Sequence, residues 1–341
     1  MSASDARPEA AGSRARWPVI GHAWAVDHLA RALRHGRVRH AYLFAGPGRI
    51  GKTRLALAFA AALNCTGPEP PCGECRACKL TLKRAHPDVM ILEAAREGGT
   101  LKIDEVRDLQ QILALRPYEA RYRVAILRNF HQATPAAEDA LLKTLEEPAP
   151  STVLLITADS ADHLLPTIVS RCQTLHLRPL PIETVRAALE RERGVEPATA
   201  RELAQLSGGR IGWALAACED PAERATRDEA IALLVTMLQG TRRERFALVE
   251  RLANDKPALL IWLGNWLGFW RDVLLVACNS HAPLTNIDHE DTIRDLAARA
   301  GREAALRALD ATRRTISALD RNVNTRLALE VLMLDYPPAH P

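Results

Sequence analysis

The chain has 341 residues, of which 48% are hydrophobic, 25% charged and 4% aromatic. This length fits two or three domains at about 100 to 200 residues each, and it excludes a small disulfide-stapled scaffold. The composition also excludes a largely disordered chain. The net charge of +4 is a mild excess, far below that of a histone-like protein.

The first residues are not expected to carry a targeting signal. Residues 1–16 are rich in Ala, Ser and Arg, which predicts a flexible tail without the apolar core of a signal peptide. No run approaches the roughly 18 apolar residues of a membrane span. We therefore expect a cytoplasmic protein with no membrane contact. Because that compartment is reducing, its seven cysteines are not expected to form disulfides.

Strand-like and helical patterns alternate through the first half of the chain. Such alternation predicts a parallel sheet with helices on both faces. The predicted strands are 40–45, 89–92, 124–127 and 153–157. The predicted helices are 23–33, 52–64, 103–115 and 135–145.

From Pro179 onward the apolar pattern is helical, and no further strand is expected. Prolines punctuate a small helical unit, and a second boundary is expected near Cys218. The predicted organisation is an α/β domain, a small all-α domain and a larger all-α domain, at residues 17–178, 179–218 and 219–341.

A phosphate-binding loop follows the first predicted strand. The sequence GPGRIGKT fits the P-loop pattern GxxxxGK[ST]. Its backbone N–H groups and the next helix's N-terminus cradle phosphates, its Lys pairs with the outer phosphates, and its Thr binds Mg²⁺. This predicts binding of ATP or ADP with Mg²⁺; the alternative is a loop that keeps its shape but no longer binds nucleotide. The nucleotide-binding candidates are Gly46, Gly48, Gly51, Lys52 and Thr53.

Hydrolysis needs more than this loop. A P-loop hydrolase carries an Asp that holds Mg²⁺, and often a Glu that activates water, at the end of a strand. Here the strand over 124–127 ends with Arg128 and Asn129, while Glu138 and Asp139 lie on the following helix. The pattern predicts nucleotide binding without hydrolysis.

Four cysteines lie within 14 residues, at Cys65, Cys72, Cys75 and Cys78. Four thiolates complete a closed tetrahedral zinc site with no position left for water, which is the structural kind. The alternatives are free thiols or a redox-active CxxC. We expect a structural Zn²⁺ at a module over 65–78.

Several stretches resemble a known family. They are the P-loop, the four-cysteine insertion and the segments HAYLF, HPD, ALLKTLEEP and LPTIVSRC, which begin at His40, His86, Ala140 and Leu165. Together they are similar to the AAA+ clamp-loader proteins of bacterial DNA polymerase III over about residues 20–180. The resemblance implies an AAA+ P-loop domain followed by an all-α lid and an all-α collar.

Within that family the chain resembles the delta-prime type. Where the motor subunits (gamma and tau) carry Asp-Glu, this chain has Arg128 and Asn129. The resemblance implies that Arg171, in the SRC motif, acts in trans as an arginine finger in a neighbouring motor subunit. Arg210 occupies a position like the sensor Arg of AAA+ lids; the alternative is an Arg without nucleotide contact. Residues 322–330 resemble the last collar helix.

The implied function is that of a non-hydrolysing subunit, without polymerase or ATPase catalysis of its own. Its implied partners are the gamma/tau and delta subunits in a hetero-pentamer, which loads the sliding clamp onto primed DNA. Two alternatives remain: an active AAA+ motor, opposed by Arg128 and Asn129, and a zinc-dependent nucleic-acid-binding module, opposed by the low net charge. A Trp stripe at Trp262, Trp266 and Trp270 is interpreted as core packing.

Overall fold

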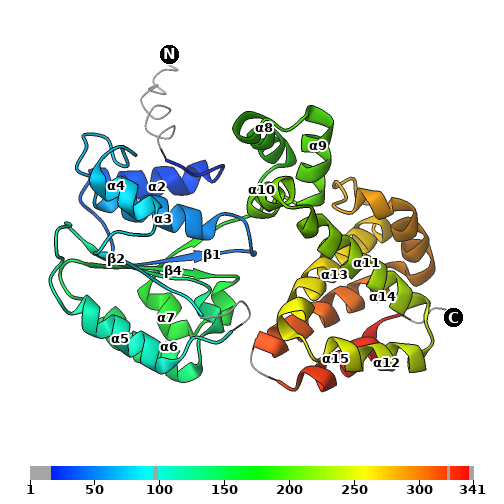
Figure 1. Cartoon of the computed structure of the whole chain (residues 1–341). Helices are drawn as coiled ribbons and strands as arrows, with labels where there is room; N and C mark the ends of the chain where they lie inside the picture. Colours follow the sequence, from blue (N-terminus) through cyan, green and yellow to red (C-terminus); the bar gives the residue numbers. More distant parts are fainter. Residues whose placement is uncertain (1–16, 95–98, 321–322, 338–341) are drawn as a thin grey trace, which may run out of the picture. The chain divides into compact units, whose positions relative to one another are not determined.

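The computed structural model describes residues 17–94, 99–320 and 323–337 (Figure 1). The chain forms two compact units, with the division between Leu180 and Pro181. The flexible tail predicted for residues 1–16 lies outside the described residues. The predicted boundary at residue 218 falls inside the second unit and stays a prediction.

The first unit is built on one five-stranded sheet in the order β2-β3-β4-β1-β5, and every paired strand is parallel. The predicted parallel α/β fold class is therefore confirmed. Because β1 lies between β4 and β5, the carboxyl ends of these three strands meet at one edge of the sheet. The strands are β1 (Ala41–Ala45), β2 (Val89–Leu92), β3 (Arg123–Leu127), β4 (Thr152–Ala158) and β5 (Gln173–His176).

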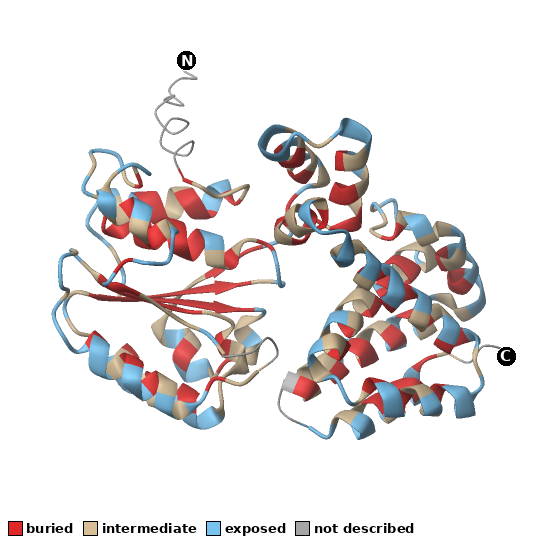
Figure 2. Ribbon diagram, in the orientation of Figure 1, coloured by how far each residue is buried: buried red, intermediate tan, exposed pale blue. Residues whose placement is uncertain are grey.

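Helices cover both faces of this sheet, and its three central strands, β1, β3 and β4, are buried (Figure 2). Alternate residues of β1 divide between two apolar clusters: Tyr42 and Phe44 pack under α2 and α3, while Leu43 packs with α5, α6 and α7. This is the burial that a parallel sheet needs on each face. The helices are α2 (Ala23–Arg34), α3 (Lys52–Leu63), α4 (Arg76–Leu82), α5 (Ile103–Leu113), α6 (Pro135–Glu146) and α7 (Pro166–Arg171).

Three elements of this unit were not predicted. Strand β5 is four residues long, polar in three of them, and pairs only with β1 at the sheet edge. Helices α4 and α7 have seven and six residues. Such short segments carry no complete hydrophobic period, so their structure depends on what they pack against.

The second unit is all helical in the residues described, as predicted. Helix α14 contains a kink at Gly301, whose φ of 70° is left-handed. The helices are α8 (Ile182–Arg193), α9 (Pro197–Leu206), α10 (Ile211–Glu219), α11 (Pro221–Gln239), α12 (Arg242–Leu252), α13 (Lys256–Ala277), α14 (Glu290–Asp320) and α15 (Thr325–Asp335).

Helix α13 forms the centre of this unit. Its Trp266, Phe269 and Trp270 are fully buried in an apolar cluster, and Trp262 is partly buried against it. The interpretation of the Trp stripe as core is confirmed. By length and composition α13 is the one described helix that could cross a membrane, yet these residues pack against its neighbours within the unit. Its buried Asp272 also accepts hydrogen bonds from Thr285 and Asn286. These are the contacts of a core helix.

Candidate phosphate and metal sites

The P-loop connects the end of β1 to α3, as the motif predicted. Gly46 has a φ of 154°, and a Cβ there would lie 2.3 Å from the carbonyl oxygen of Leu177. Gly51 has a φ of 105° and precedes the first turn of α3. Only glycine meets both demands without strain. A Cβ at Gly48, by contrast, would meet no described atom within 4 Å, so close packing does not require a glycine there.

Lys52 is 5% exposed and its ammonium group is fully engaged. Its Nζ donates to the carbonyl oxygens of Gly46 and Pro47, the latter at 2.9 Å. It also donates to Oδ1 of Asp159 at 2.6 Å. A lysine has three N–H donors, so these partners use all of them. Thr53, the predicted Mg²⁺ ligand, is half-buried in the first turn of α3.

Sequence reasoning missed Asp159. It directly follows β4, and β4 is the neighbour of β1, so the sheet order brings its carboxylate to the P-loop. His131 Nε2 lies 3.8 Å from its second oxygen. Desolvation opposes ionisation of the Asp159 carboxyl although its side chain is 42% exposed, but the positive charges of Lys52 and His131 outweigh that effect and hold the pKa below its usual value.

The end of β3 has a different chemistry. Arg128 forms an ion pair with Glu93, and the N–H of Asn129 donates to Oγ1 of Thr157 at 2.9 Å. Glu138 is buried in α6, where it accepts a hydrogen bond from the backbone of Leu165. Burial raises its pKa to about 7. Because Arg128 and Asn129 carry no carboxylate, the end of β3 supplies no acidic Mg²⁺ ligand at the P-loop.

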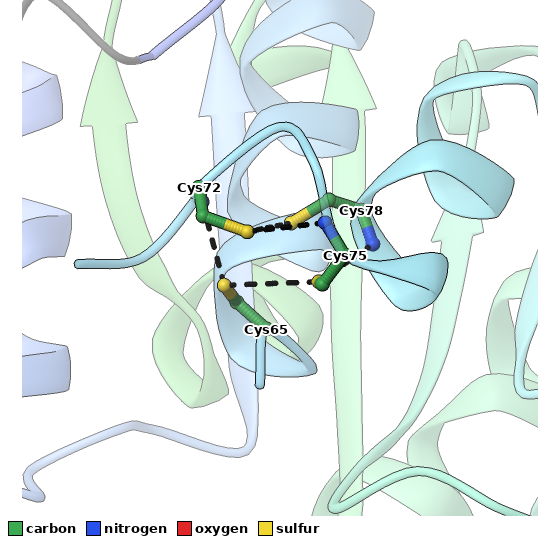
Figure 3. Close-up of side chains that lie close together, drawn as sticks. All are labelled: Cys65, Cys72, Cys75 and Cys78. Carbon is green, nitrogen blue, oxygen red and sulfur yellow. Dashed lines mark hydrogen bonds between the residues drawn. The ribbon is translucent and has the colours of Figure 1, made fainter. Parts of the chain in front are cut away.

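The four cysteines come together beyond the C-terminal end of α3 (Figure 3). Their sulfur atoms all lie within 4.8 Å of one another, and the Cys65–Cys75 and Cys72–Cys78 pairs are each 4.0 Å apart. Tetrahedral zinc with bonds of about 2.3 Å requires sulfur atoms about 3.8 Å apart. The cluster is therefore consistent with a structural zinc site.

Backbone N–H groups point at these sulfur atoms. Cys65 Sγ accepts from Gly67 at 3.3 Å and from Cys72 at 3.4 Å, and Cys75 Sγ accepts from Cys78 at 3.4 Å. Burial opposes ionisation of Cys75, but hydrogen bonds from Cys78 and Thr66 outweigh it and lower the pKa of this thiol to about 6. Such bonds stabilise the thiolate form of Cys75 that a metal requires, whereas burial raises the pKa of Cys65 and of Cys78.

Arg171 is the last residue of α7, and its side chain is 36% exposed. Its guanidinium donates to the carbonyl oxygen of Thr167 at 3.0 Å and to Oε1 of Glu146 at 2.7 Å. The residue is thus held at the surface of the first unit. Arg210 belongs to the second unit, where it precedes α10 and donates from Nε to the carbonyl oxygen of Ser207 at 2.9 Å.

The comparisons with known proteins agree along both units. A family model described as DNA polymerase III, delta subunit, matches residues 21–181. A second, described as DNA polymerase III, delta subunit, C terminal, matches residues 223–336. The delta′ subunit of Bacillus subtilis is 28% identical over 310 residues, which cover 90% of this chain and 93% of that protein.

The chain belongs to the DNA polymerase III delta′ family.

Other relatives match a shorter part of the chain. The delta′ subunit of Pseudomonas aeruginosa is 40% identical over 176 residues, covering 50% of this chain and 53% of that protein. The gamma/tau subunit of Mycobacterium bovis is 40% identical over 177 residues, covering 51% of this chain. The chain spans only 30% of the length of that gamma/tau relative. The predicted membership of the delta-prime type is confirmed. The AAA+-like α/β unit also carries the expected cysteine cluster.

Proposed function

We propose that this delta′-family protein acts in the cytoplasm as a non-hydrolysing subunit of the clamp loader. Its partners in the proposed hetero-pentamer are the gamma/tau and delta subunits, and the complex loads the sliding clamp onto primed DNA with ATP. The observation that carries the proposal is the agreement of two delta-subunit family models over both units. Within this proposal, residues 179–218 form the lid and residues 219–341 the collar.

An exposed apolar face supports assembly through the second unit. Beside and along α15, Val323, Leu327, Val331 and Leu334 are 45%, 57%, 51% and 60% exposed. The last three are spaced by four and three residues, which places them on one side of the helix. A contiguous apolar face of this kind is typical of a protein–protein contact. We assign it to the collar.

The proposed role of the P-loop is to bind ATP or ADP with Mg²⁺ without turnover. The positive φ angles of Gly46 and Gly51 and the position of Lys52 against the loop support this role. Arg128 and Asn129 provide neither the metal-binding nor the water-activating carboxylate of a hydrolase. An active motor is the competing function, favoured by the 40% identity to gamma/tau over 177 residues and opposed by the end of β3. The contact of Arg210 with nucleotide belongs to this proposal as well.

The second proposed role is that of Arg171, as an arginine finger for a neighbouring motor subunit. A guanidinium presented across a subunit boundary stabilises charge that develops on the transferred phosphoryl group. The exposed position of Arg171 at the end of α7 supports this role. Its pair with Glu146 is a surface ion pair, worth about 0 to 1 kcal/mol, so a phosphate can replace it at little cost.

The test is a loader reconstituted from this chain, the motor subunits and delta. Arg171→Ala should leave assembly intact and lower the turnover of the neighbouring motor site by about 10³-fold or more. Arg171→Lys should rescue only partly, because an ammonium lacks the planar fork of donors. Arg186→Ala is the matched control, since Arg186 also forms exposed ion pairs, with Glu183 and Glu190.

Two results would contradict these proposals. A chain that does not join the motor and delta subunits is not a loader subunit. Complexes with Arg171→Ala that assemble, load clamps at the wild-type rate and hydrolyse ATP at every site would leave Arg171 with a structural role only.

A further inference from the structure

The ammonium group of Lys52 has no free donor for a phosphate. Its three partners are the carbonyl oxygens of Gly46 and Pro47 and the carboxylate of Asp159. An incoming phosphate oxygen can therefore reach Lys52 only by displacing one of them. Two of the three are fixed in the backbone of the loop itself. The third is a side chain that is 42% exposed, so it is the partner that can turn away.

The charges at this site also indicate that Asp159 is the partner that leaves Lys52. The Asp159 carboxylate lies 2.6 Å from Lys52 Nζ, where it places the negative charge that a phosphate would otherwise bring. If it stayed there, the two anions would repel each other within a few ångströms of the same cation. His131 lies on the other side of this carboxylate, 3.8 Å from Oδ2, and offers it a second partner when it leaves Lys52.

We propose that Asp159 sets the phosphate affinity of the P-loop: it is the internal counter-ion of Lys52, and a nucleoside diphosphate must displace it in order to bind. This inference rests on the proposed nucleotide binding. It means that a residue directly after β4, outside the P-loop motif, regulates the phosphate affinity of the loop. The end of β3, with Arg128 and Asn129, contributes no competing anion.

The test compares Asp159→Asn with the wild-type full chain by calorimetric titration with ADP, first without added Mg²⁺ and then with it, in a buffer free of chelator so that zinc stays bound. An amide keeps the shape of the side chain but removes its charge. Loss of a competing charged hydrogen bond should tighten ADP binding by about 10-fold or more. Asp162→Asn is the matched control: Asp162 is exposed three residues further on, bonds to Ser160, and makes the same change in net charge. It should bind ADP as the wild type does.

In Asp159→Asn, the new amide oxygen can still accept a hydrogen bond from Lys52 and so hide the effect. A second variant, Asp159→Ser, has a shorter side chain and avoids this problem. It should also bind ADP more tightly than the wild type, and melting curves without ligand show whether each variant is folded. Wild-type binding that neither folded variant tightens overturns the inference but leaves nucleotide binding in place. If neither the wild type nor the variants bind ADP at millimolar concentration, with or without Mg²⁺, nucleotide binding fails too, whereas assembly of the loader is a separate result.

Discussion

The two ends of helix α3 carry two sites that differ in whether their side chains already have partners. At its first residue, Lys52 is satisfied by two carbonyl oxygens and by Asp159, all from this chain. Beyond its last turn, the four cysteines have mainly one another and a few backbone N–H groups as partners. The phosphate end is chemically complete without a ligand, and the cysteine end is not.

Phosphate would therefore compete with a partner that Lys52 already has, whereas zinc would supply the partner that the four cysteines lack. Phosphate must replace an existing ion pair at Lys52, so its net binding free energy is small. Zinc would replace weak S–H contacts by four metal–thiolate bonds, and apparent binding free energies of structural zinc sites are about 10 to 16 kcal/mol. We therefore expect metal binding to dominate the stability of the first unit, and nucleotide binding to be weak.

The largest effect should come from removing the metal ligands. The wild-type chain should hold one zinc in native mass spectrometry, and a chain with both Cys72→Ser and Cys75→Ser should hold none. Its free energy of unfolding should fall by at least about 3 kcal/mol, because the loop then loses the metal that orders it. Cys278→Ser, at an exposed cysteine in the second unit, is the control. Four thiols that react with an alkylating reagent in the native wild type would disprove the zinc site.

A smaller effect is expected at the phosphate end. Lys52→Ala should weaken ADP binding by about 10- to 100-fold, since it removes a charged hydrogen-bond donor to phosphate. Zinc content should not change. Lys83→Ala, at an exposed lysine, should bind ADP normally. The wild type should show no steady-state turnover near 1 per second, the lower end for ordinary enzymes; turnover at that rate, lost in Lys52→Ala, would favour the motor function.

The smallest effect is the response to acid. The folded-state pKa of Asp159 is lowered, so its pair with Lys52 stabilises the fold above about pH 4 and is lost as pH falls below that value. The stability difference between wild type and Asp159→Asn should be constant from pH 7 to about 5 and then shrink. Zinc should be released at a higher pH, because thiols have an ordinary pKa of about 8.5 and must stay ionised to bind it. A difference that grows on acidification would contradict the sign.

Most of what was predicted about these sites is local in sequence. The P-loop glycines, Lys52 and the four cysteines lie within short spacings, and their conformations follow from φ angles and close approaches inside one loop. The lack of carboxylates at the end of β3 could also be predicted, because Arg128 and Asn129 follow a strand of five buried residues. The alternation of strands and helices was enough to predict a parallel sheet.

What the sequence alone did not decide depends on which strands are neighbours. Asp159 is 107 residues from Lys52, and it reaches the P-loop only because β4 pairs with β1. The edge strand β5 has too few apolar residues to be predicted, and it forms because β1 offers an open edge. Hydrophobic periodicity reports which residues are buried but not the order in which strands pair, since that order is set by contacts distant in sequence.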